Sequence, residues 1–389
     1  MTLLAMAVDP LKILSTRFRV RSLVLFSLLL VYIGFSLFLF FQWIGPSLDG
    51  RTDQHIAADS ATYIYFADSL REGREDPFVI AALSTFPNNL WLPVLVALAL
   101  KSPLAVVLAN YTMFFLALIL WKKCYSFSLG VFVALLLLNA TTTISLLSVN
   151  KEIVDLLAVS IFFFAWRKRR HGVLLLALML ALINRSEVCL VMILFLLAQS
   201  KLNPFHRRRV ITIAVLITGL SLMLPLAVSN TLSQRFEEAS SAQTVALLDS
   251  LEMHYLYGVA VIPKIAENLF GELLNVSKWK TLFVGSSDVA NSYILLLNNL
   301  ATAVVFFVLV KKRALRVRSD LIYFAVLGCV VMAVSLVIQP RYFYFVYVLL
   351  CFQAAQTEVC NSAGGIFHRK QGSGIHHGAS LGKKEAVVG

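Results

Sequence analysis

The sequence predicts an all-α fold, a polytopic bundle of transmembrane helices. Of its 389 residues, 59% are hydrophobic and 14% are charged, and the mean hydropathy is +0.80. Soluble domains are closer to half apolar and about a quarter charged. Apolar runs of about 20 residues, the length that a helix needs to cross a bilayer, recur along the whole chain. The charges between these runs predict about ten spans, with both termini in the cytoplasm.

Positive charge is concentrated in short blocks between the apolar runs. The net charge of +13 therefore favours the cytoplasmic loops of a membrane protein over a nucleic-acid-binding surface. The polar stretches 45–85 and 230–290 hold seven acids against three bases and seven acids against four, so we expect both to be extracytoplasmic. The basic blocks, expected in the cytoplasm, are Arg17 to Arg21, Lys122 and Lys123, Arg167 to Arg170, Lys201 with Arg207 to Arg209, and Lys311 to Arg318.

The first predicted helix, 22–44, crosses outward. Its apolar run is too long for a signal-peptide core and lacks a small-residue cleavage site, so we expect it to be retained. After loop 45–85, the run 86–121 is long for one span. We expect one crossing near 103–121, preceded by an interfacial or re-entrant piece at 88–100; three crossings is the alternative.

The segment 172–199 has basic residues on both flanks and the polar cluster Asn184–Glu187 at its middle. One helix cannot begin and end on the same side of the membrane. We therefore predict two short helices that meet at an outward tip formed by the polar cluster. The remaining crossings are expected at 127–149, 152–166, 210–229, 291–310, 321–338 and 341–357.

These assignments give one membrane domain, 1–360, with extracytoplasmic loops 45–85 and 230–290, and a disordered cytoplasmic tail, 361–389. Apolar residues at helical spacing between Thr244 and Leu274 predict amphipathic helices on the membrane surface. The five cysteines are scattered and show no metal-ligand spacing, which argues against a metal site or a disulfide framework.

Ionisable groups near the hydrocarbon region are costly, and they are usually functional or paired. Four such sites are expected at the outer face. They are Asp53 with Asp59, Asn150–Lys151–Glu152, Asn184–Arg185–Ser186–Glu187, and Gln339–Pro340–Arg341–Tyr342.

Each site also has an ordinary structural interpretation. Lys151 and Asp155 are four residues apart and can pair on one helix face. The Arg185–Glu187 segment can be a solvated turn, and Arg341–Tyr342 can be an interfacial anchor. Asp59 alone can be a solvated loop acid. The joint pattern, carboxylates and three cations on one membrane face, carries more information than any single site.

This set of groups suits a lipid-linked sugar phosphate. Arg and Lys can bind its phosphate and stabilise the charge that grows on the leaving group. A carboxylate can accept the proton of an attacking hydroxyl. The chain contains no glycine-rich phosphate loop, Walker pattern or Asp-x-Asp motif, and His376–His377 is too isolated for a metal site.

With these residues the chain resembles the GT-C superfamily, multi-span glycosyltransferases that use polyprenyl-phosphate sugars. The segment Asp59–Ala67 is similar to the family's first outer loop with its catalytic acid, although Ser60 stands where a second acid is usual. Ala181–Glu187 and Pro340–Tyr342 are similar to the family's Arg-containing outer turns. Asn150–Ile153 is similar to a Lys-Glu motif in membrane proteins of exopolysaccharide and O-antigen polymerisation.

The resemblance implies a glycosyltransferase or polysaccharide polymerase in the bacterial inner membrane. It would transfer a sugar or oligosaccharide from a polyprenyl-linked donor to a lipid-linked or glycan acceptor at the outer face, among membrane lipids and without nucleic acid. Asp59 would be the base, with Asp53 as the alternative acid. The expected substrate-binding residues are Lys151, Glu152, Arg185, Glu187, Arg341 and Tyr342.

No cofactor is indicated, and dependence on a divalent cation stays open. Two functions of other classes stay open as well. A transporter or flippase of lipid-linked saccharides would use the same cations along a transport pathway, and it would also need polar residues towards the cytoplasmic side. A non-catalytic subunit of a polysaccharide assembly complex would need these residues for complex abundance and not for chemistry.

Overall fold

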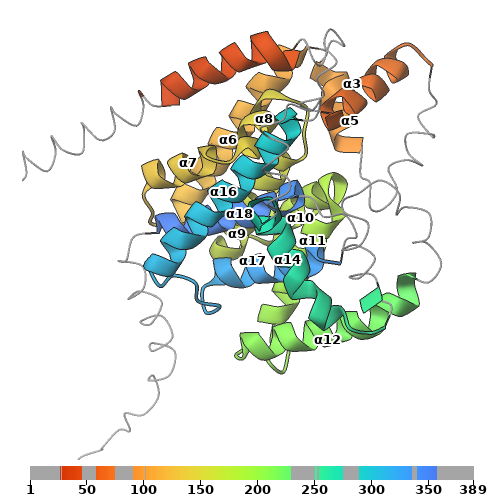
Figure 1. Cartoon of the computed structure of the whole chain (residues 1–389), viewed down its shortest axis with the longest axis vertical. Coiled ribbons are helices and arrows are strands. Elements are labelled where there is room, and N and C mark those ends of the chain that lie inside the picture. Colours follow the sequence, from red (N-terminus) through yellow and green to blue (C-terminus); the bar gives the residue numbers. More distant parts are fainter. Residues whose placement is uncertain are drawn as a thin grey trace, which may run out of the picture.

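The structure is a computed structural model. It describes residues 27, 29–45, 58–74, 91–100, 102–228, 250–251, 254–274, 289–334 and 340–356. Within these residues every regular element is a helix, and the β-type contact present is one isolated bridge between Phe127 and Gln356. The predicted all-α class is confirmed (Figure 1).

The described chain begins with an apolar helix, Leu29–Gln42, that runs into a π-helical turn, η1 (Phe40–Ile44). The helices that follow are α3 (Ala58–Arg71), α5 (Trp91–Leu100), α6 (Pro103–Cys124), α7 (Leu129–Leu137), α8 (Ala140–Leu147), α9 (Glu152–Lys168), α10 (His171–Asn184), α11 (Ser186–Gln199), α12 (Arg209–Val228), α14 (Tyr257–Leu274), α16 (Val289–Lys311), α17 (Asp320–Met332), the 3₁₀ turn η2 (Pro340–Phe343) and α18 (Tyr344–Ala355).

Helices α9 and α18 form the centre of the bundle. Twelve of the 17 residues of α9 and all 12 residues of α18 are buried, as expected for helices that are apolar on every side. Helix α9 packs against α6, α8, α10 and α18. The beginning of α9 is therefore held by several neighbours.

Aromatic rings from several helices fill this centre. The ring centroid of Trp121 on α6 lies 4.4 Å from that of Phe352 on α18 and 5.3 Å from that of Phe163 on α9. Helices α17 and α18 approach closely because Gly328 has no side chain. A Cβ atom at Gly328 would lie 2.6 Å from the ring of Phe345, far inside van der Waals contact.

The polar cluster in segment 172–199 is confirmed as a break between two helices, since α10 ends at Asn184 and α11 begins at Ser186. The expected single crossing at 127–149 differs. It consists of α7 and α8, bent by 85° relative to each other. Asn139 explains the break, because its side chain caps α8 by accepting a 2.9 Å hydrogen bond from the amide of Thr141.

Two helices in the described part are long and apolar enough to cross a membrane, Pro103–Cys124 and Ile294–Lys311. A third crossing is added if the bent pair α7–α8 is one span. Six shorter apolar helices in the described part have 10–17 residues each. The expected number of spans is therefore not confirmed.

Each expected extracytoplasmic loop contains a described helix. In loop 45–85 it is α3, and in loop 230–290 it is α14, which contains Pro263. Helix α14 buries Tyr257 and Val261 together with the polar Lys264 and Asn268, and it exposes the apolar Ile262. The tail 361–389 lies outside the described residues.

Candidate functional site

The candidate site begins at the turn between α8 and α9. The Nδ2 group of Asn110, on α6, donates hydrogen bonds to the carbonyl oxygens of Ser145 and Ser148 at 3.0 and 2.8 Å. These carbonyls belong to the C-terminal end of α8, where backbone acceptors have no partner within the helix. A buried asparagine on a neighbouring helix therefore fixes the chain just before Lys151.

Helix α3 is attached to the same turn. The buried hydroxyl of Ser60 accepts a 2.8 Å hydrogen bond from the backbone amide of Val149. Asp59 precedes Ser60 in the first turn of α3, so its backbone lies at the end of α3 that meets the Lys151 turn. Asp53 lies outside the described residues.

Glu152 and Asp155 lie in the first turn of α9, and both are 1% exposed. Their spacing of three residues puts both carboxylates on one face of the helix. That face points towards the break between α10 and α11. Two buried carboxylates so close together need a cation or hydrogen-bond donors to offset the cost of burial.

Arg185 supplies that cation. It is the single residue between α10 and α11, with extended backbone angles (φ −154°, ψ 104°), and it is 6% exposed. Its guanidinium lies 3.0 Å from Glu152 Oε1 and 3.2 Å from Asp155 Oδ2. The local break therefore directs a charged side chain inward, onto both acids.

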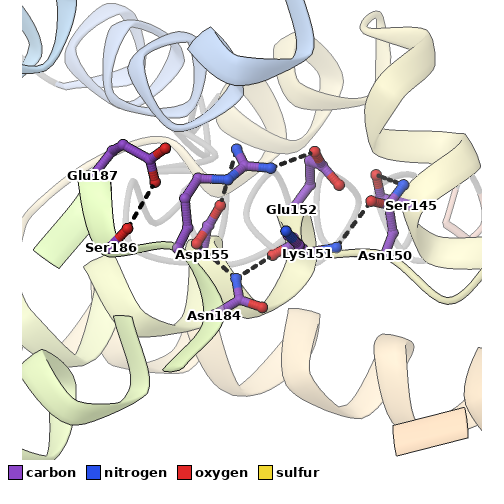
Figure 2. A network of polar contacts seen from close by, with 9 residues as sticks. Ser145, Asn150, Lys151, Glu152, Asp155, Asn184, Ser186 and Glu187 are labelled. Atoms are coloured by element: carbon purple, nitrogen blue, oxygen red, sulfur yellow. Dashed lines mark hydrogen bonds and ion pairs between the residues drawn. The ribbon is translucent and has the colours of Figure 1, made fainter. Parts of the chain in front are cut away.

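Asn184 completes the contact between the helices. Its Nδ2 group donates to Asp155 Oδ1 at 2.7 Å and to the carbonyl oxygen of Lys151 at 2.9 Å. Figure 2 shows the labelled Asn184, Asp155, Lys151 and Glu152 side by side in one polar network. We call Lys151, Glu152, Asp155, Asn184 and Arg185 the α9–α11 network.

The α9–α11 network overturns two of the ordinary interpretations. Asp155 does not pair with Lys151; its ion-pair partner is Arg185, from another helix break. Nor is Arg185 part of a solvated turn, because 94% of its surface is covered. Glu187, by contrast, is partly exposed and accepts a 3.3 Å hydrogen bond from the hydroxyl of its neighbour Ser186.

Tyr342 connects this network to Arg341. The guanidinium carbon of Arg185 lies 5.4 Å from the centroid of the Tyr342 ring, and that of Arg341 lies 5.5 Å from it. These distances are typical of cation–π contacts. Three predicted site residues from the α10–α11 break and from η2 are thus in contact.

The cluster has balanced charge. Lys151, Arg185 and Arg341 stand against Glu152, Asp155 and Glu187, of which the first two acids are in contact with Arg185. Lys151 and Arg341 are the partly exposed cations. Burial, reinforced by the positive charge of Arg185, lowers the pKa of the Lys151 ammonium from its ordinary value.

Two buried acceptors of the network have unused capacity within the described part of the chain. Glu152 Oε2 and Asn184 Oδ1 accept no hydrogen bond from the described residues. Both atoms belong to side chains that also hold Arg185 or Asp155.

Sequence reasoning gave Asp155 only a possible pairing with Lys151 and gave Asn184 no individual role, and it missed Asn110 and the contact that Ser60 makes. The signal for Asn184 and Asn110 was present, since each is an amide in a long apolar run, where a buried polar group requires a partner. No group of three or more His, Cys, Asp or Glu side chains among the described residues could hold a metal ion.

Comparison with known proteins adds no relative. No family model, no curated protein and no solved structure matches this chain.

Proposed function

We propose that this chain is a membrane glycosyltransferase or polysaccharide polymerase that acts on a polyprenyl-linked donor at the extracytoplasmic face. The observation that carries the proposal is the contact of Arg185 with Glu152 and, through the Tyr342 ring, with Arg341, next to the turn that holds Lys151. These residues come from three separate polar interruptions of an apolar chain. The two spanning-length helices support the proposed membrane location.

The ion pairs suggest different roles for Arg185 and for the other two cations, Lys151 and Arg341. Arg185 is neutralised by Glu152 and Asp155, so it acts as a positioning residue that fixes the Tyr342 ring. Lys151 and Arg341, which are partly exposed, are the proposed ligands of the donor phosphate. Their positive charge would stabilise the negative charge that develops on the departing phosphate.

The reaction follows from these roles. The oxygen of an acceptor hydroxyl attacks the anomeric carbon of the donor and forms the new glycosidic bond. The bond between that carbon and the phosphate oxygen breaks, and the polyprenyl phosphate or diphosphate leaves with the electron pair. Asp59 accepts the proton of the hydroxyl.

The decisive experiment is Asp59→Asn. A strain that lacks the chromosomal copy is complemented with the parent or the variant, and glycan product and lipid-linked intermediates are measured together with the membrane level of the protein. We expect no product, accumulation of lipid-linked saccharide, and an unchanged protein level. Glu72→Gln is the matched control, because Glu72 is an exposed acid one residue after α3 that pairs with exposed Arg74.

Product formation by Asp59→Asn would reject the assignment of the base, and Asp53→Asn would then be tested. Accumulation on the outer leaflet supports the transferase, since the donor has already crossed the membrane. Accumulation confined to the inner leaflet would instead favour the flippase.

A further inference from the structure

A second feature of the molecule is an apolar pocket far from the α9–α11 network. It has a volume of about 310 Å³ and lies between α11, α12 and α17. Leu197 of α11, Val215 and Leu216 of α12 and Leu327 of α17 line it. Its polar edge is formed by Ser200, Asn203 and Thr212, at the turn between α11 and α12.

The turn at the edge of the pocket has a defined structure. Asn203 Nδ2 donates to the carbonyl oxygen of Ala198 at 2.9 Å and to the hydroxyl of Thr212 at 3.1 Å. The amide of Phe205 donates to Asn203 Oδ1 at 2.9 Å. The backbone of this turn, which carries Lys201, Arg207 and Arg208, is therefore held in a defined conformation beside the pocket.

Two basic segments meet at this edge. Arg209 Nη1 donates to the carbonyl oxygens of Val317 and Arg318 at 3.1 and 2.8 Å, so the turn after α11 lies against the turn before α17. Asp320 is the sole acid in segments 200–209 and 312–320, and Arg209 already holds it. The bases of these segments are Lys201, Arg207, Arg208, Arg209, Lys312, Arg313, Arg316 and Arg318.

The surface around the pocket combines this charge with exposed apolar side chains. Leu202 is 85% exposed and Val210 is 68% exposed. Lys201, Arg207 and Arg208 beside them are also exposed. Positive charge above an apolar groove matches a molecule with an anionic head and hydrocarbon chains, and clusters of Lys and Arg at the cytoplasmic end of membrane helices recognise such lipids.

We propose that this pocket binds one anionic phospholipid of the cytoplasmic leaflet. An acyl chain occupies the apolar pocket between α11, α12 and α17, and the phosphate is held by Lys201, Arg207 and Arg208. The inference rests on the membrane location in the proposed function and not on the transfer reaction. It assigns the lipid by its chemistry, a phosphate diester with two acyl chains.

The test uses the full-length protein, purified in detergent, with palmitoyl-oleoyl phosphatidylglycerol or the corresponding phosphatidylcholine as the added lipid. Native mass spectrometry counts retained lipid, and thermal unfolding gives the accompanying stabilisation. We expect the parent to retain one phosphatidylglycerol about thirtyfold better than phosphatidylcholine, the effect expected of two arginines near an anionic lipid head group. Inorganic phosphate at millimolar concentration should not compete.

Two variants separate the two halves of the site. Arg207→Gln with Arg208→Gln should abolish the preference for phosphatidylglycerol. Val215→Phe, at a position that is 53% exposed and therefore tolerant of a larger side chain, should fill the pocket and reduce retention of both lipids. Lys168→Gln with Arg170→Gln removes equal charge from the end of α9 and the turn after it, and should leave retention unchanged.

Equal retention of the two lipids by the parent would overturn the proposal, as would undiminished retention by Val215→Phe. A dimer that Val215→Phe dissociates without loss of lipid would show instead that a second copy of the chain occupies the pocket. Asp59→Asn, the variant that tests the proposed function, should retain the lipid as the parent does. Failure of the transferase assignment and failure of the lipid site can therefore be distinguished.

Discussion

The hydroxyl of Ser60 accepts a hydrogen bond from the amide of Val149 at 2.8 Å, across 89 residues of sequence. This contact fixes the first turn of α3, which carries Asp59, against the turn that carries Lys151. The base and a phosphate-binding cation that we propose are thus linked through one buried side chain. Its removal should affect stability and activity together.

Ser60→Ala should lower the free energy of unfolding by about 1 kcal/mol, because the buried Val149 amide loses its acceptor. Activity should fall further than stability, since Asp59 is no longer fixed relative to Lys151. Thermal unfolding of the purified protein and the rate of glycan formation check the two effects. Ser69→Ala on the same helix is the control, because the buried Ser69 hydroxyl has no hydrogen-bond partner among the described residues. Equal effects of the two substitutions would show that Ser60 does not position Asp59.

The Arg185 ion pairs predict a non-additive response to substitution. Arg185→Met leaves two buried carboxylates without their cation and should cost about 3–5 kcal/mol, whereas replacing all three charges by apolar groups should cost much less. The measurement compares chemical or thermal unfolding of Arg185→Met with that of the triple variant Glu152→Leu, Asp155→Leu and Arg185→Met. A triple variant less stable than Arg185→Met would show that the pairs contribute net stability. Both variants should be inactive, because each releases the Tyr342 ring.

Because the Lys151 side chain, in the turn before α9, is largely buried, we expect a rise in pH to have opposite effects on activity and on the free energy of unfolding. Burial and the nearby Arg185 lower its pKa below the ordinary value of 10.5. As pH rises through that lowered pKa, the folded protein loses the charge that we assign to phosphate binding, and activity should fall. Between the lowered and the ordinary pKa, the unfolded chain binds more protons than the folded chain, so stability should rise with pH.

The substitution that checks this assignment is Lys151→Arg, which remains charged at all accessible pH values. Its activity should persist to higher pH than that of the parent. Lys151→Met should have low activity at every pH and should lack the rise in stability. An alkaline limit that is identical in the parent and in Lys151→Arg would assign that limit to another group.

Local signals in the sequence predicted the helical class and the break at Asn184–Glu187, because a polar run inside an apolar segment interrupts a buried helix. The sequence also contained a signal for the bend between α7 and α8, since Asn139 before Ala140 is a common N-cap pattern that marks the start of a new helix. The ion-pair partner of Asp155 could not be predicted in this way. Spacing along one helix favoured Lys151, whereas the actual partner, Arg185, follows 30 residues later on a neighbouring element. Such contacts depend on how helices pack, and the periodicity of one segment does not contain that information.

Substitutions at Tyr342 can distinguish the contribution of the phenolic hydroxyl to activity from that of the aromatic ring. Its ring is contacted by the guanidinium groups of Arg185 and Arg341 at 5.4 and 5.5 Å, so the π face is the part that the proposed role requires. Tyr342→Phe keeps that face, and transfer activity should stay within about threefold of the parent. Tyr342→Leu loses both cation–π contacts, about 1–2 kcal/mol in all, and should raise the donor KM by about tenfold.

Steady-state kinetics with a purified lipid-linked donor distinguishes the outcomes. A higher donor KM with an unchanged KM for the acceptor would agree with a ring that positions the phosphate-binding arginine. Loss of activity in Tyr342→Phe would instead assign the essential contact to the phenolic hydroxyl. Full activity in Tyr342→Leu would show that Arg341 keeps its position without the ring, and the link between the α9–α11 network and η2 would then have no part in donor binding.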